Sequence, residues 1–130
     1  MKKKILVVCS KGRNRSKYLA GYLRRKGYLT RNGGVEPYRS KEHKEKYKSS
    51  LIKQEDVDWA EIIVVVRRRL VKILKKKFKI GKKKLIALNV TDSKKSIPKK
   101  YAHLKELDHK SFQKAWTYPQ LRKAINGKII

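Results

Sequence analysis

The residues best suited to chemistry lie near the start of the chain, in the run Cys-Ser-Lys-Gly-Arg-Asn-Arg-Ser at positions 9–16. Cys9 and Arg15 are separated by five residues, and Ser16 follows the arginine. A short loop that closes onto a helix turns its backbone N–H groups inward and forms a concave anion site. Arg15 can donate two parallel hydrogen bonds to phosphate oxygens, and these positive surroundings favour the thiolate form of Cys9. The spacing therefore predicts attack by the Cys9 sulfur on a bound phosphate ester, with Ser16 hydrogen-bonded to that sulfur.

A loop of this kind needs a strand before it and a helix after it, and the sequence predicts both. Residues 4–9 predict a strand, apolar from Ile5 onward, and apolar side chains then recur at helical spacing until Gly27. Three more strands are predicted at 35–39, 62–66 and 85–90, separated by helical patterns. Strands that alternate with helices indicate βαβ units, so we expect an α/β fold with a four-stranded parallel sheet and helices on both faces.

Other segments have weaker patterns. Thr-Arg-Asn-Gly-Gly at 30–34 has the composition of a turn, which places the second predicted strand after it, at a sheet edge because of Pro37. Residues 98–130 are expected to be helical, with an interruption at Pro119.

A general acid must reach the phosphate site to protonate the leaving oxygen and then to activate water. Ligands of parallel sheets bind at the carboxyl ends of the strands, and Asp92 follows the fourth predicted strand at the same edge as Cys9. We therefore expect Asp92 to be the general acid, with an ordinary turn role as the alternative. Asp108 is the second candidate. The three histidines lack the spacing of metal ligands, so surface or structural roles are expected for His43, His103 and His109.

The strand, the Cys-x5-Arg-Ser loop and the following helix resemble the low-molecular-weight protein tyrosine phosphatases, and most closely their shortened bacterial and archaeal relatives. Asp-Trp-Ala-Glu at 58–61, followed by the apolar run 62–66, is also similar to an element of that family. The resemblance covers about residues 3–95, so residues 98–130 would be a helical extension of a single phosphatase-like domain spanning 1–130. It implies a flavodoxin-like fold and hydrolysis of phosphomonoesters through a phosphocysteine intermediate, without metal or cofactor.

The resemblance also implies roles for individual residues. Cys9 matches the nucleophile, Arg15 the phosphate-binding arginine, Ser16 the thiolate-supporting hydroxyl and Asp92 the general acid. Phosphorylated proteins or other phosphomonoesters would be the substrates. The phosphate-binding loop would comprise Ser10, Lys11, Gly12, Arg13, Asn14, Arg15 and Ser16.

Two positions depart from the family pattern. Gly12 stands where the family usually has an asparagine in a left-handed backbone conformation, which glycine also adopts without penalty. Asp92 lacks the Pro-Tyr that usually follows, so no aromatic wall for a phosphotyrosine ring is evident. Tyr38 and Tyr101 are candidates for such a wall, although core or surface roles are the simpler interpretation.

The charge of the chain suggests a second class of partner. The sequence has 38 Lys and Arg residues against 10 Asp and Glu residues, a net charge of +28. This excess is larger than solubility requires and predicts contact with a polyanion, nucleic acid first. A basic nucleic-acid-binding module that keeps the loop without catalysis is therefore the main alternative, and a phosphatase acting on nucleic-acid phosphates combines both ideas.

A single cysteine excludes an internal disulfide and is typical of a reducing compartment. Arsenate reduction on the same scaffold usually needs further cysteines, which makes it the least favoured interpretation. Because no apolar run is long enough for a signal peptide or a membrane span, we expect a cytoplasmic protein that does not contact a membrane.

Overall fold

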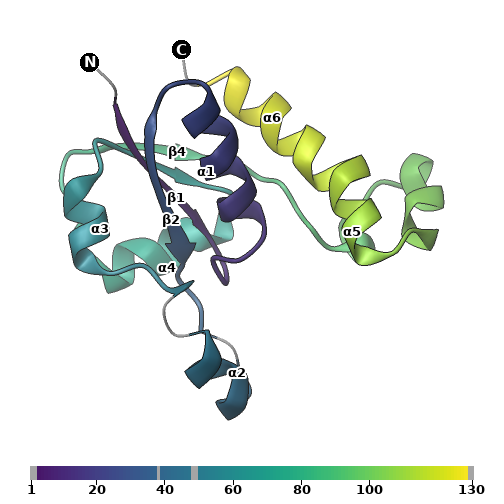
Figure 1. The fold of residues 1–130 in the computed structure, drawn as a ribbon, viewed down its shortest axis with the longest axis horizontal. Helices are drawn as coiled ribbons and strands as arrows, with labels where there is room; N and C mark the ends of the chain where they lie inside the picture. Colours follow the sequence, from purple (N-terminus) through teal and green to yellow (C-terminus); the bar gives the residue numbers. More distant parts are fainter. Residues whose placement is uncertain (1–2, 38, 48–49, 129–130) are drawn as a thin grey trace.

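The computed structural model describes residues 3–37, 39–47 and 50–128. Its centre is a sheet of four parallel strands in the order β2-β1-β3-β4 (Figure 1). The strands are β1 (Lys4–Cys9), β2 (Leu29–Gly34), β3 (Ile62–Val65) and β4 (Lys84–Ala87). This order is that of the flavodoxin-like doubly wound folds, so the predicted fold class is confirmed.

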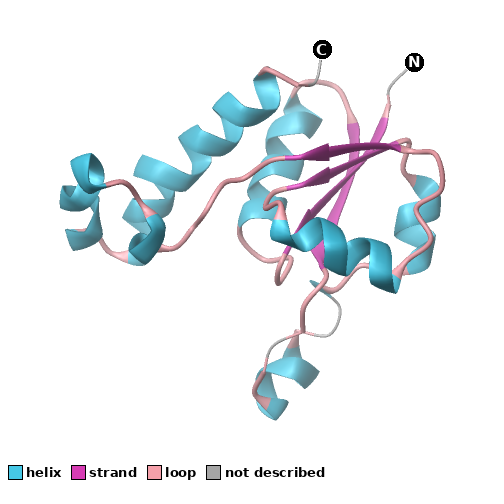
Figure 2. Ribbon diagram, turned by 180° about the vertical axis from the view of Figure 1, so that it is seen from behind, coloured by secondary structure: helices cyan, strands magenta, loops and turns pink. Residues whose placement is uncertain are grey.

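Helices cover both faces of the sheet (Figures 1 and 2). One face carries α1 (Arg15–Arg25) and α6 (Tyr118–Asn126), and the other carries α3 (Gln54–Trp59) and α4 (Arg69–Lys77). The short helix α2 (Lys41–Lys46) projects away from the sheet beyond the carboxyl end of β2. None of the helices in the described ranges combines the length and the apolar character needed to cross a bilayer.

The core is densest around the two central strands. Every residue of Ile5–Val8 and of Ile63–Val66 is fully buried, since each of these strands has helices above and below it and a strand on either side. Full burial of such a side chain stabilises the fold by about 1.5–3 kcal/mol, so β1 is a rigid support for the loop that begins at its last residue. Around Phe112 and Trp116, a second, smaller cluster packs residues 97–107 against the C-terminal helix.

The second strand differs from the sequence prediction. It occupies Leu29–Gly34, the segment with turn composition, and not 35–39. The glycines serve close packing: a Cβ on Gly33 would lie 2.5 Å from the Ile52 side chain, and one on Gly34 would lie 2.4 Å from the backbone of Lys11. A strand packed this closely against a loop needs glycine, and the two glycines give the segment the composition of a turn.

The C-terminal helix is also more continuous than predicted. Helix α5 (His109–Phe112), a π-helical turn (Gln113–Thr117) and α6 follow one another without a break. Pro119 lies in the first turn of α6, directly after the π turn, in which the Tyr118 N–H donates to the Gln113 carbonyl. The wider turn accommodates the proline, whose ring would collide with a carbonyl of a regular α-helix.

Candidate active site

The catalytic candidates gather in one pocket of about 360 Å³ at the carboxyl end of β1. Cys9 and Arg15 line it together with Asp92, which comes from the loop after β4. The complete lining is Cys9, Ser10, Lys11, Arg13, Asn14, Arg15, Asp92 and His109. A larger and more open hollow of about 850 Å³ lies on the other side of Ser10 and Lys11, and Cys9 does not line it.

Cys9 is the last residue of β1, and its sulfur is held by two neighbours. The thiol donates to Ser16 Oγ at 3.1 Å and accepts from the Gly12 N–H at 3.1 Å, while the side chain as a whole is 3% exposed. Since a hydroxyl rotates freely, Ser16 can donate to the sulfur when Cys9 is a thiolate. The described contacts of the sulfur can therefore stabilise its ionised form, which is the nucleophilic one.

Asn32 of β2 supports this arrangement and was missed by the sequence analysis. Its Nδ2 donates to Ser16 Oγ and to the Gly12 carbonyl, each at 3.4 Å. The Ser16 oxygen thus already accepts one hydrogen bond, which leaves its own hydrogen to point at the Cys9 sulfur. Asn32 could not be recognised from the sequence because it belongs to the segment 30–34, whose composition is that of a turn.

Gly12 has φ of +79°, the left-handed conformation expected from the sequence. A Cβ at this position would lie 2.2 Å from the Ser50 carbonyl oxygen and 2.5 Å from the Gly34 nitrogen. Both the dihedral angle and the surrounding backbone therefore require glycine here.

Arg15 begins helix α1 and is 6% exposed. Its Nη1 donates to the Val90 carbonyl at 2.9 Å, its Nη2 to Ser10 Oγ at 3.4 Å, and its Nε lies 3.5 Å from Asp92 Oδ2. A guanidinium anchored on several sides presents its remaining donors in a fixed geometry, as binding of a tetrahedral oxyanion requires.

Asn14 connects the loop to the C-terminal part of the chain. Its Nδ2 donates to Asp92 Oδ2 at 3.1 Å and to Gln113 Oε1 at 2.9 Å. Gln113 and the pocket-lining His109 were not predicted as site residues, because nothing in a helical pattern marks a glutamine that turns inward.

The basic residues of the loop lie at its rim. Lys11 Nζ donates to the Pro37 carbonyl at 3.0 Å, and the guanidinium of the exposed Arg13 lies 3.7 Å from the centroid of the Tyr47 ring. Ser16, by contrast, is fully buried behind the sulfur and does not line the pocket. The rim therefore contributes positive charge, and the floor contributes the reactive group.

The remaining candidates lie elsewhere. Asp108 is the N-cap of α5, where its Oδ1 accepts from the Ser111 N–H at 2.7 Å, and hydrogen bonding from Ser111 lowers the pKa of the Asp108 carboxyl. Tyr101 packs on Trp116 with ring centroids 5.1 Å apart, and Tyr38 lies outside the described residues. Among the residues that the structure describes, no group of three His, Cys, Asp or Glu side chains could hold a metal ion.

Comparison with known proteins supports the fold through structure alone. No family model matches the sequence, and no curated protein is similar to it. The low-molecular-weight protein tyrosine phosphatase from T. tengcongensis superposes with a TM-score of 0.59 and 15% identity over 97% of this chain and 99% of that one. SP-PTP, a low molecular weight protein tyrosine phosphatase from Streptococcus pyogenes, superposes with a TM-score of 0.60 and 14% identity over 98% of this chain and 90% of that one. A YwlE arginine phosphatase mutant with a phosphorylated active-site serine superposes with a TM-score of 0.53 and 15% identity over 95% of this chain and 94% of that one.

The chain therefore has the fold of the low-molecular-weight protein tyrosine phosphatases. The similarity to the T. tengcongensis structure spans almost the whole chain, so it extends well into the C-terminal segment that lay outside the sequence resemblance.

Proposed function

We propose that the protein is a cysteine-dependent phosphatase that hydrolyses phosphomonoesters through a phosphocysteine intermediate. The observation that carries this proposal is the joint lining of one pocket by a sulfur, a buried guanidinium and a carboxylate. Those three groups supply the nucleophile, the oxyanion binder and the proton donor that the reaction needs.

In the first step the Cys9 thiolate attacks phosphorus, forming an S–P bond as the bond to the leaving oxygen breaks. Arg15 and the amides of the loop bind the equatorial oxygens, where charge accumulates in the transition state. Asp92 gives its proton to the leaving oxygen. Both described contacts of its carboxylate use Oδ2, so Oδ1 is the atom that carries this proton.

In the second step water attacks the phosphocysteine, and Asp92 accepts the proton of that water. The S–P bond breaks, inorganic phosphate leaves and the thiolate returns. Ser16 favours this step because its hydroxyl, at 3.1 Å from the sulfur, stabilises the thiolate as a leaving group.

Phosphorylated proteins are the proposed substrates, in line with the protein phosphatases that share the fold. One of these similar structures is named as an arginine phosphatase with a phosphorylated active-site serine, which supports a nucleophile at the corresponding place in this pocket. Because that fold also serves a phosphoarginine enzyme, the substrate side chain must be identified by assay, with phosphotyrosine and phosphoarginine peptides compared directly.

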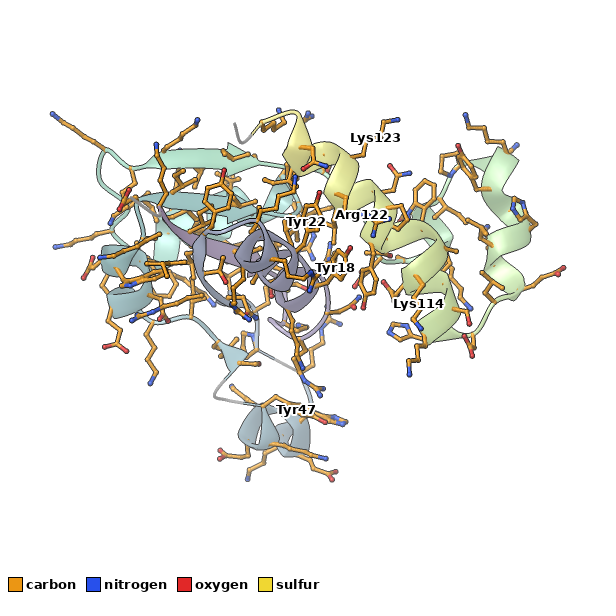
Figure 3. All side chains as sticks on the ribbon, turned by 45° about the horizontal axis from the view of Figure 1, so that its top comes forward. Tyr18, Tyr22, Tyr47, Lys114, Arg122 and Lys123 are labelled. Carbon is orange, nitrogen blue, oxygen red and sulfur yellow. The ribbon has the colours of Figure 1, made fainter. Side chains whose placement is uncertain are left out.

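The alternative function, binding of nucleic acid, has less support than the net charge of the chain suggested. Tyr18, on the α1–α6 face, lies between Tyr118, at 3.9 Å between ring centroids, and Tyr22, at 6.4 Å. Tyr18 also accepts a hydrogen bond from Arg122 (Figure 3). Because both faces of the Tyr18 ring are occupied, that ring is not available for stacking of unpaired bases.

Turnover of p-nitrophenyl phosphate by wild type, Cys9→Ser and Asp92→Asn tests the proposal. We expect the wild type to release p-nitrophenol, Cys9→Ser to be inactive, and Asp92→Asn to retain only a small fraction of the rate. Lys123→Ala, on the exposed side of α6, is the control and should match the wild type. Equal turnover by wild type and Cys9→Ser would rule out the phosphocysteine route.

A further inference from the structure

The amide of Asn14 can adopt only one orientation. Its Nδ2 faces two acceptors, Asp92 Oδ2 and Gln113 Oε1, and its Oδ1 accepts from the Tyr118 hydroxyl at 3.1 Å. Burial raises the pKa of Tyr118, with smaller contributions from Tyr18 and Asp92, so the phenol keeps its proton and remains a donor. Turning the amide over would set its oxygen against two other oxygens.

Gln113 is consequently fixed as well. Its side chain is 2% exposed, Oε1 accepts from Asn14, and Nε2 lies 3.5 Å from the Asp92 carbonyl oxygen and 3.4 Å from His109 Nδ1. Since Nε2 can only donate, His109 Nδ1 is the acceptor of this contact. One buried amide thus contacts three residues that line the pocket, Asn14, Asp92 and His109.

The backbone at Gln113 is unusual. Gln113 opens the π-helical turn, a rare element that is frequent at functional sites. Burial of a glutamine is unfavourable unless its polar atoms are paired, and an apolar side chain would fill this position at a lower desolvation free energy. The position therefore carries a polar side chain whose described hydrogen bonds lead to the pocket.

We propose that Gln113 is a positioning residue for the general acid. This inference rests on the proposed function. Gln113 Oε1 accepts one N–H of the Asn14 amide, and the other N–H donates to Asp92 Oδ2. The second hydrogen bond fixes the Asp92 carboxyl, so that the proton on Oδ1 points at the leaving oxygen. Without Gln113, the Asn14 amide keeps only its hydrogen bonds to Tyr118 and Asp92, and the direction of the Asp92 carboxyl is less closely fixed.

Leaving-group dependence distinguishes this role from a structural one. Phenol is a poorer leaving group than p-nitrophenol and depends more on protonation, so a misaligned acid slows phenyl phosphate selectively. We expect Gln113→Met, which keeps the volume but removes both polar atoms, to lower kcat/KM for phenyl phosphate by between about tenfold and a hundredfold. The kcat/KM for p-nitrophenyl phosphate reports only the steps up to the phosphocysteine and should change by less than about threefold, because loss of p-nitrophenol needs little proton transfer.

The same substitution in the Asp92→Asn background gives the second readout. With no acid to position, Gln113→Met should have no further effect on phenyl phosphate. Gln120→Met, on the next helical segment, should match its parent protein in either background. Equal slowing of both substrates, or the same loss in the Asp92→Asn background, would overturn the positioning role while leaving the phosphatase proposal intact. A wild type that turns over neither substrate would overturn both.

Discussion

Arg15 Nε lies 3.5 Å from Asp92 Oδ2, so the side chain proposed to bind phosphate contacts the side chain proposed to deliver the proton. The pair is mostly shielded from solvent, with the two side chains 7% and 33% exposed. Two functions of one reaction therefore share a contact, and a change at Arg15 should affect both binding and proton transfer.

Replacing Arg15 by lysine should lower kcat/KM by about a hundredfold or more, although the charge is kept. An ammonium group cannot contact the Val90 carbonyl, Ser10 Oγ and Asp92 at once, as the guanidinium does. Steady-state kinetics with p-nitrophenyl phosphate provide the measurement. Arg122→Lys, which changes an arginine bonded to Tyr18 outside the pocket, should leave the rate unaltered. A fully active Arg15→Lys enzyme would contradict the proposed oxyanion role.

Removal of the Ser16 hydroxyl should slow turnover by roughly tenfold, because one hydrogen bond to the sulfur contributes about 1–1.5 kcal/mol. The matched measurement is Asn32→Ala, which leaves the hydroxyl in place but removes the donor that orients it. We expect the second loss to be smaller than the first, and the double variant to be no slower than Ser16→Ala. Additive losses would show that Asn32 acts independently of Ser16.

Gly12→Ala should destabilise the fold and abolish activity together. The left-handed conformation costs an alanine about 1–2 kcal/mol, and the added Cβ collides with the Ser50 and Gly34 backbone. Thermal unfolding monitored by circular dichroism gives the change in Tm. Gly127→Ala is the control, since a Cβ there meets nothing within 4 Å and its φ is −82°. A Gly12→Ala protein as stable as the control would mean that the loop has another conformation.

Asp108 should make stability depend on pH. Hydrogen bonding from Ser111 lowers its pKa in the folded state, so its contribution to stability is present above its unfolded pKa of about 4. That contribution is lost as the pH falls through the lower, folded value. Between pH about 4 and the folded pKa, the wild type should therefore lose more of its free energy of unfolding than Asp108→Asn does. Urea unfolding at several pH values measures both slopes, and parallel slopes would contradict the capping contact.

The positive hollow beside the pocket should make catalysis sensitive to salt. Lys11, Arg39, Arg69 and Lys77 line it, and Glu36 is the one carboxylate among the described residues of its lining. We expect kcat/KM for a phosphopeptide with acidic neighbours to fall as salt is added, since screening shortens the reach of surface charge to about 10 Å at 0.1 M. The same peptide with neutral neighbours is the control. Arg39→Gln should reduce the difference between the two peptides, and an identical salt response for both would exclude this influence.

Local patterns predicted the central part of the molecule well. The runs 5–9 and 62–66 are apolar throughout because both faces of β1 and β3 are covered, and this burial is what an unbroken apolar run encodes. Asp92 was accessible to prediction for a related reason: parallel strands bring their carboxyl ends to one edge, so a residue just past β4 reaches the loop after β1.

What escaped prediction depends on contacts distant in sequence. Gly33 and Gly34 are strand residues because a loop and Ile52 lie against them, which composition alone cannot reveal. Gln113 turns inward because the helix widens there, and its partner Asn14 is separated from it by 99 positions in the chain. Local periodicity carries no information about such a pairing.

The hydrogen bond between Asn14 and Gln113 also determines the order in which parts of the molecule fold. Closing so long a segment is slow relative to forming a helix or pairing neighbouring strands, because the chain entropy of the whole loop must be lost first. During synthesis the loop, Arg15 and Asp92 leave the ribosome before α5 exists, so a nascent chain has the proposed nucleophile long before the proposed acid is held in place. The complete arrangement of the pocket is therefore among the last features the molecule acquires, and fraying of the C-terminal helix would reverse it while the sheet remains folded.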